Sequence, residues 1–198
     1  TTLFRSRQTG IYKKPEAKGI YVRPQGVRGD TIGNPKVHGD RFKACYLFDT
    51  GEYDYWKALY PSLDWGYGMF GENLSVAGLD ETSLLIGSTY RAGESLLRIT
   101  APREPCFKLG VRFGDQGIID RFVARGKPGT YVEVLEEGWV RPGDLVRLEQ
   151  QADTALSIAD FYRLLYDTDK NRGHLEAALH LPVMDEGKRE QFKRWARA

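Results

Sequence analysis

The stretch SLLRITAPREPCFKL, residues 95–109, joins a strand pattern to an isolated thiol. In residues 95–100 apolar side chains recur at alternate positions, which is typical of a β-strand buried on one face. Pro102 and Pro105 then restrict the backbone, so the segment that carries Cys106 is stiff and extended and directs its side chain. This stretch predicts a β-rich domain with one oriented thiol just beyond a strand.

The flanking residues give Cys106 a chemical context. Arg103 and Lys108 lie close enough in sequence to supply positive potential, which favours a thiolate, either as a nucleophile or as a soft metal ligand. The alternative is a buried cysteine that acts as a small hydrophobic residue. Cys45 lies in the apolar run 42–48 and is expected in the core. The sequence alone leaves a Cys45–Cys106 disulfide open.

Composition narrows the function classes. The chain has 198 residues, 41% hydrophobic and 28% charged, which favours a soluble globular domain over disorder. A net charge of +2 argues against a nucleic acid polymer as partner, and no apolar run is long enough for a membrane span. Residues 1–7 lack the apolar stretch of a signal peptide. Two cysteines form no disulfide framework and favour the cytoplasm, and the spacing of three histidines and two cysteines argues against zinc.

The order of elements predicts a mixed α+β fold with a β-barrel core. Residues 53–60 and 117–126 show helical patterns that stop at Pro61 and Gly126. Beyond residue 150 the sequence pattern changes from short strands to helices, and Ser157 resembles a helix cap. We therefore expect a domain over 1–150 and a small three-helix unit over 151–198. The expected strands are 19–23, 43–48, 83–86, 95–100, 131–135 and 144–148, and the later helices start at Ser157 and span 175–181 and 188–198.

Three further segments carry residues suited to ligand binding. The loop 36–43 places His38 beside a glycine, and the run 70–75 combines glycine, carboxylate, carboxamide and hydroxyl. Lys108 and Arg112 flank Gly110 and could hold a phosphate in a loop. Solvated loops and turns are the alternatives for all three. His174 and His180 fall in the C-terminal helices and are expected to be structural.

In this order the segments resemble the MOSC domain family, and most closely its stand-alone YiiM-type members with a three-helix C-terminal extension. The resemblance covers nearly the whole chain. The segments that carry it are Gly29-Asp30, Lys36-Val37-His38-Gly39 with Lys43-Ala44, Phe70-Gly71-Glu72-Asn73-Leu74-Ser75, Gly78-Leu79, Ile86-Gly87, and Pro102-Arg103 with Pro105-Cys106-Phe107-Lys108-Leu109. Residues 38–44 depart from the family, which often has a Gly-Pro turn after this histidine.

The resemblance implies a β-barrel that binds the molybdenum–pyranopterin cofactor, with Cys106 as the protein ligand to the metal. It also implies reduction of N-hydroxylated compounds, such as hydroxylaminopurine-type base analogues and amidoximes. His38 is then a candidate proton donor, since a departing oxygen must be protonated. The residues expected around the cofactor are Lys43, Gly71, Glu72, Asn73, Ser75, Arg103, Lys108 and Arg112.

Electrons would come from a separate flavin or iron–sulfur partner, because the chain shows neither a dinucleotide fingerprint nor a cysteine cluster. Two alternatives stay open. One is a cofactor or sulfur carrier that uses Cys106 without turnover, and the other is a hydrolase that pairs Cys106 with His38. The C-terminal helices could dock the electron donor, form a homodimer, or cover the barrel.

Overall fold

Two β-sheets form the centre of the molecule in the computed structural model, which describes residues 10–30 and 41–197. Six strands follow the order β4-β3-β7-β6-β5-β9, and three follow the order β2-β1-β8. The strands are β1 (Ile20–Arg23), β2 (Gly26–Val27), β3 (Cys45–Asp49), β4 (Leu74–Val76), β5 (Thr89–Ala92), β6 (Ser95–Pro102), β7 (Thr130–Glu136), β8 (Gly138–Val140) and β9 (Val146–Gln150).

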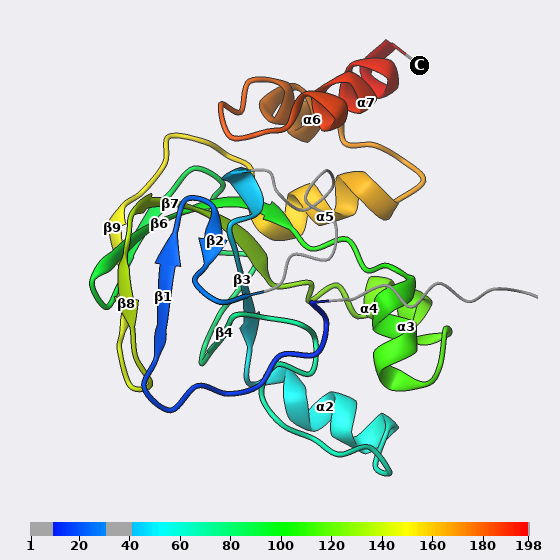
Figure 1. Cartoon of the computed structure of the whole chain (residues 1–198). Coiled ribbons are helices and arrows are strands. Elements are labelled where there is room, and N and C mark those ends of the chain that lie inside the picture. Colours follow the sequence, from blue (N-terminus) through cyan, green and yellow to red (C-terminus); the bar gives the residue numbers. More distant parts are fainter. Residues whose placement is uncertain (1–9, 31–40, 198) are drawn as a thin grey trace, which may run out of the picture.

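The longest pairing joins β6 to β7, and it explains why the sheet has one buried face. Leu97 pairs with Val134 and Ile99 with Val132, and all four side chains are at most 3% exposed. Cross-strand partners share a face of a sheet, so these residues line the inside of the curve. The sheets curl into a half barrel with β1, β2 and β8 on one side (Figure 1).

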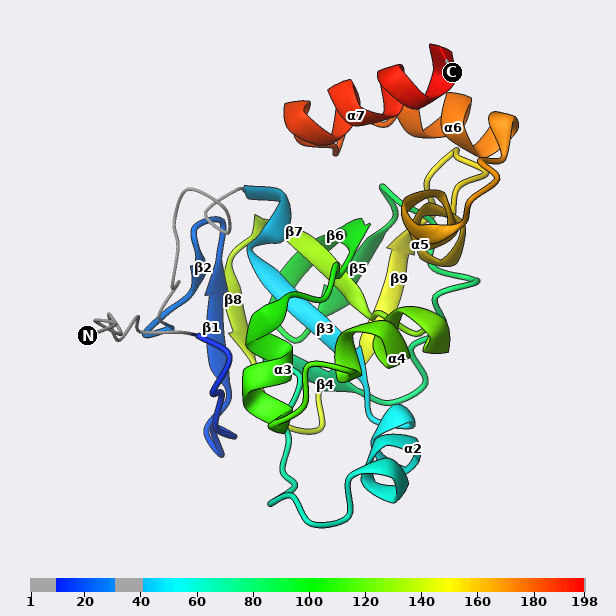
Figure 2. The same ribbon diagram turned by 90° about the vertical axis from the view of Figure 1, so that its right-hand side faces the viewer.

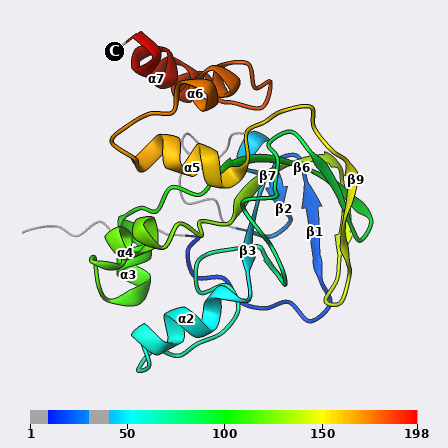
Figure 3. The same ribbon diagram turned by 180° about the vertical axis from the view of Figure 1, so that it is seen from behind.

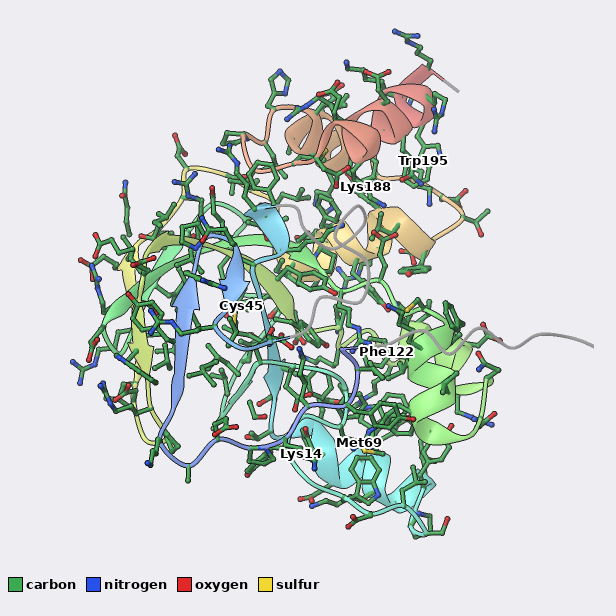
Figure 4. All side chains as sticks on the ribbon, viewed as in Figure 1. Lys14, Cys45, Met69, Phe122, Lys188 and Trp195 are labelled. Atoms are coloured by element: carbon green, nitrogen blue, oxygen red, sulfur yellow. The ribbon has the colours of Figure 1, made fainter. Side chains whose placement is uncertain are left out.

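Three helices cover one end of the half barrel. They are α2 (Glu52–Leu59), α3 (Phe107–Phe113) and α4 (Ile118–Arg125), and α4 ends at Gly126 with φ 68° as its glycine stop predicts. Their apolar faces meet in an aromatic cluster that includes Trp56, Phe70 and Phe122, all fully buried. Figure 4 shows Met69 and Phe122 in this region, between α2 and the pair α3–α4.

The other three helices lie at the opposite end. They are α5 (Ile158–Tyr166), α6 (Arg172–Leu179) and α7 (Glu186–Arg197). Figures 2 and 3 show α5 against the sheet, with α6 and α7 stacked beyond it. The predicted cap is confirmed, because Asp160 N–H donates to Ser157 Oγ at 3.1 Å and the Asp160 carboxylate accepts from Ser157 N–H. The α6 helix begins earlier than predicted, at the cap residue Asn171.

Two sequence-based predictions of local structure were wrong. Residues 83–86 form no strand and contribute one isolated bridge, Leu85 to Ser157, although Leu84 and Ile86 are buried as their apolar pattern requires. Residues 107–113 form the helix α3, whereas Lys108 and Arg112 were expected in a loop beside Gly110. Cys45 is 1% exposed, as predicted for a core residue. In the described part of the chain, no helix combines the length and apolarity that crossing a membrane requires.

Candidate functional site

Cys106 lies at the junction between β6 and α3. Its backbone is extended, with φ −133° and ψ 171°, and Phe107 begins the helix directly after it. The thiol is free and half-buried, and it borders a pocket of about 150 Å³. The two prolines thus bring an oriented thiol to a concave surface, as the sequence predicted.

Cations from four separate segments line this pocket. They are Lys13 before β1, Lys43 in the 3-10 turn Arg41–Lys43, Arg103 after β6, and Lys108 in α3. Carboxylates are contributed by Asp30 and Glu104. With four cations against two carboxylates, the pocket favours an anionic ligand beside the thiol.

Arg103 ties the Cys106 segment to the loop at residue 70. The residue is only 5% exposed, and its guanidinium donates a hydrogen bond to the Phe70 carbonyl. It also lies over the Tyr46 ring, 5.0 Å from the ring centroid. Burying a cation requires such fixed partners, so Arg103 holds the pocket walls together as well as adding charge.

Gly71 and Asn73 form a second wall. Gly71 has φ 77°, a conformation that favours glycine, and a Cβ there would come within 2.8 Å of the Ile11 side chain. The Asn73 side chain accepts from Tyr46 N–H at 3.0 Å and donates to Asp30 at 2.9 Å. The backbone conformation thus favours glycine at position 71, and two hydrogen bonds fix the Asn73 side chain in the pocket wall.

Glu72 and Ser75 lie outside the pocket that contains Cys106. The Glu72 carboxylate is 2% exposed and accepts from the N–H groups of Gly68 (2.8 Å) and Phe70 (3.0 Å). It also accepts from the Tyr53 hydroxyl and from Ser75 Oγ. These two side chains stabilise the loop that positions Gly71 and Asn73.

Lys108 and Arg112 are one helical turn apart in α3, and only Lys108 lines the pocket. The Arg112 guanidinium lies over the Tyr12 ring at 4.8 Å. Its Nε is buried and has no hydrogen-bond partner among the described residues. The expected phosphate loop is thus a helix that points one of its two cations into the pocket.

The predicted proton donor His38 lies outside the described residues, as do the neighbouring residues 36 and 39. His174 lies in α6 and His180 at its C-terminal end, and neither lines the pocket. The His180 ring nitrogen Nδ1 lies 2.8 Å from the Glu176 carbonyl, a local helix contact.

Five charged or aromatic residues of the pocket were not among the predicted site residues. Lys13 donates a hydrogen bond to the Asp30 carboxylate, which also accepts one from the Asn73 side-chain amide. Glu104 forms an ion pair with Lys188 of α7 at 2.9 Å, and Tyr46 and Tyr131 contribute adjacent rings. Asp30 belongs to the Gly29-Asp30 segment of the family resemblance, whereas Lys13 has no local signal because only the fold brings it to the pocket.

The donor set of the pocket fits the molybdenum–pyranopterin group. A thiol is the soft donor that such a metal accepts, and the lysines suit an anionic pterin phosphate. No group of three or more metal-ligating side chains occurs in the described residues, and Cys106 would be the soft protein donor to the metal in this pocket. The pocket is small for the whole group, so the cofactor would extend outward from it, and a separate cavity of about 710 Å³ lies beyond the shared residues Lys13 and Asn73.

The chain is similar in sequence to known proteins and in fold to a solved structure. YflK of Bacillus subtilis is 31% identical over 185 residues, covering 93% of this chain and 83% of that protein. A Gibberella moniliformis protein named reductase is 27% identical over 180 residues, which cover 89% of this chain, yet this chain spans only 32% of that protein. The crystal structure of YiiM from Geobacillus stearothermophilus superposes with a TM-score of 0.82 at 29% identity, covering 96% of this chain and 90% of that one.

YiiM of Escherichia coli is 31% identical over 158 residues, which cover 77% of this chain and 70% of that protein. The match to the MOSC domain covers residues 34–147, which include Lys43, Asn73 and Cys106. The chain therefore belongs to the MOSC domain family and has a YiiM-like fold.

Proposed function

We propose that this protein is a molybdenum-cofactor-dependent reductase that converts N-hydroxylated compounds to their N–H forms. The observation that carries the proposal is the pocket in which the Cys106 thiol meets four cations. Membership of the MOSC family and a distant relative named reductase support an oxidoreductase. Hydroxylaminopurine-type bases and amidoximes are the proposed substrates.

The cofactor, when bound, would supply the two-electron chemistry that turns N–OH into N–H and releases water. Cys106 would bind the metal, while Lys43 and Lys108 would bind anionic parts of the cofactor. Arg103 and Asn73 would orient it, because both are fixed by hydrogen bonds to backbone groups of the pocket walls. Glu72 and Ser75 would not line the cofactor pocket but would stabilise the loop that positions Gly71 and Asn73.

His38 is the proposed donor of the proton to the departing oxygen. If His38→Ala leaves turnover unchanged while the cofactor stays bound, this assignment is wrong. Electrons would arrive from a separate flavin or iron–sulfur protein. We place the protein in the cytoplasm, where a reducing environment keeps both cysteines as thiols.

Metal analysis tests the proposal directly. The molybdenum and pterin content is measured in wild type, Cys106→Ala and Cys45→Ala, each expressed in a host that loads other molybdoenzymes. We expect both components in the wild type and in Cys45→Ala, whose altered side chain is buried and does not line the pocket, and neither in Cys106→Ala. Absence of molybdenum from all three proteins would overturn the proposal.

Turnover separates the reductase from a carrier. Loaded protein is mixed with an N-hydroxylated purine or an amidoxime and reduced methyl viologen, and the N–H product is measured. Product formation supports the reductase. Loaded protein without product would instead favour a cofactor carrier that binds through Cys106.

A further inference from the structure

The cavity of about 710 Å³ inside the half barrel has a lining unlike that of the Cys106 pocket. Its inner part is made by Leu47, Leu97, Ile99 and Val132, and each of these side chains is at most 2% exposed. The volume lies within the range of about 300–1,000 Å³ that small-molecule sites occupy in proteins. Curved sheets of this size can hold one small ligand between their inner faces.

A continuous apolar row leads from this interior to the surface. Val134 pairs with Leu97, Leu97 with Tyr90, and Tyr90 with Leu148, so the four side chains share the inner face. Val134 is 3% and Leu97 0% exposed, whereas Leu148 is 52% exposed. Leu148 would be buried in a closed barrel, but no pairing joins β8 to β9 among the described strands. The half barrel is therefore open along β9.

The charges at the opening are balanced. Lys13 is paired with Asp30, and Arg141 with Glu94 at 2.7 Å. Figure 4 shows Lys14 near the start of the described chain, below the sheets. The carboxylates Glu16, Asp80 and Asp144 also line the cavity, and Asp80 is paired with Lys127 at 3.5 Å, so both signs are mixed and no cluster of one sign selects a charged ligand.

One hydrogen-bond donor faces this apolar space. Tyr90 lines the cavity and is half-buried, and burial is the cause that raises the pKa of its phenol. None of the described residues forms a hydrogen bond with its hydroxyl, whereas the Glu72 carboxylate nearby is fully used by its own loop. A phenol in such surroundings donates to an acceptor that enters the cavity.

We propose that the open side of the half barrel binds an uncharged, largely apolar small molecule with one hydrogen-bond acceptor, which accepts from the Tyr90 hydroxyl. The site is separate from the Cys106 pocket, with the Lys13–Asp30–Asn73 contacts between them. It does not depend on the proposed reductase activity. The naphthalene ketone prodan matches this description and changes its fluorescence with polarity and hydrogen bonding.

The test is a prodan titration of the full chain followed by fluorescence. We expect saturable binding to one site. Tyr90→Phe should weaken it about three- to ten-fold and shift the emission to shorter wavelength, because one hydrogen bond to the ketone is lost. Leu148 does not itself line the cavity but is the cross-strand partner of Tyr90, so Leu148→Lys places a charge beside the proposed donor and should weaken binding about ten-fold or more.

Val111→Lys is the matched control, because Val111 is 51% exposed on α3, away from the cavity, and close to Leu148 in exposure. It should leave prodan binding unchanged. The unfolding temperature of each variant is measured, and all three are expected to stay folded because their altered positions are half-buried or exposed. Absence of saturable binding to wild type, or equal binding by wild type, Tyr90→Phe and Leu148→Lys, overturns the proposal.

Discussion

The two cysteines show that the reactivity of a thiol depends on its surroundings. Cys106 is half-buried at the mouth of a pocket, whereas Cys45 is 1% exposed in β3. Burial raises the pKa of the Cys45 thiol from 9.0 to about 12. Because the thiolate is the reactive form, Cys45 should be inert at neutral pH.

Iodoacetamide should therefore add one carbamidomethyl group to the native protein. Mass spectrometry should locate it on Cys106, and a second group should appear only after denaturation. Cys106→Ala should remain unmodified in the native state. Modification of Cys45 at a similar rate in folded protein would contradict the burial of β3.

Glu72 gives a second prediction at this scale. Its carboxylate accepts three hydrogen bonds from the loop 68–75 and one from the Tyr53 hydroxyl of α2, and an amide can replace only part of them. Glu72→Gln should lower the free energy of unfolding by about 2–3 kcal/mol, because hydrogen bonds to a buried charge are strong. Ser75→Ala removes one of the four and should cost about 1 kcal/mol. Urea denaturation compares the two, and equal effects would refute a central role for the carboxylate.

Some residues of the candidate site were predicted from the sequence, and others were not. Lys43, Gly71, Asn73, Arg103, Cys106 and Lys108 lie in segments that the family resemblance identified, and the fold brings them to one pocket. Glu72 belongs to the same run, but its burial cannot be deduced from the order of residues. Lys13 could not be predicted, because it reaches the pocket through a long-range contact with Asp30.

At the scale of elements, α3 shows why the local sequence pattern did not predict every helix. Its seven residues include Gly110, which usually weakens a helix. The end of the Gln116 side chain lies within 2.4 Å of where a Cβ of residue 110 would be, and Leu109 and Phe113 on either side of Gly110 are buried. Tertiary contact thus overrides helix propensity. The longer helices α4 and α5 have stop and cap signals in the sequence and were predicted.

The α5 cap allows a quantitative test. Ser157→Ala removes the acceptor for Asp160 N–H and should lower stability by about 0.5–2 kcal/mol. For a chain of this length that corresponds to a fall of about 1–8 °C in unfolding temperature. Ser83→Ala is the control, since the exposed Ser83 hydroxyl only donates to the Asp80 carbonyl. Calorimetry should show little change for it, and equal losses would mean that the capping box contributes nothing.

At the scale of the whole molecule, Glu81 links distant segments. Its carboxylate is 1% exposed and accepts from Gly129 N–H and Lys127 Nζ, each at 3.1 Å. Burial is the largest cause of its raised pKa, which lies above the ordinary 4.5. The folded state therefore binds a proton more tightly than the unfolded state, and stability falls as pH rises above about 4.5.

Glu81→Gln removes this titration. The stability of the variant relative to wild type should rise between about pH 4.5 and the raised pKa, and then level off. Urea unfolding at several pH values measures the difference. A difference that is flat or falls over this interval would show that the carboxylate is not destabilised by burial.

The hydrophobic core crosses residue 150, where the sequence predicts a boundary between two units. Leu156, Phe161 and Phe192 belong to the same buried cluster as Leu97 and Val132 of the sheet. Figure 4 shows Trp195 and Lys188 on α7, and Lys188 reaches Glu104 beside the pocket. A continuous core predicts that both parts unfold together.

Phe192→Ala and Leu97→Ala test this with one change on each side of residue 150. Both side chains are fully buried, so each variant should lose about 2–5 kcal/mol. Each should lower the temperature of one common transition, with equal calorimetric and van't Hoff enthalpies. If Phe192→Ala instead produced a second, earlier transition while the first stayed in place, the C-terminal helices would be an independent folding unit. Because α5 packs directly on β6, we expect the single transition.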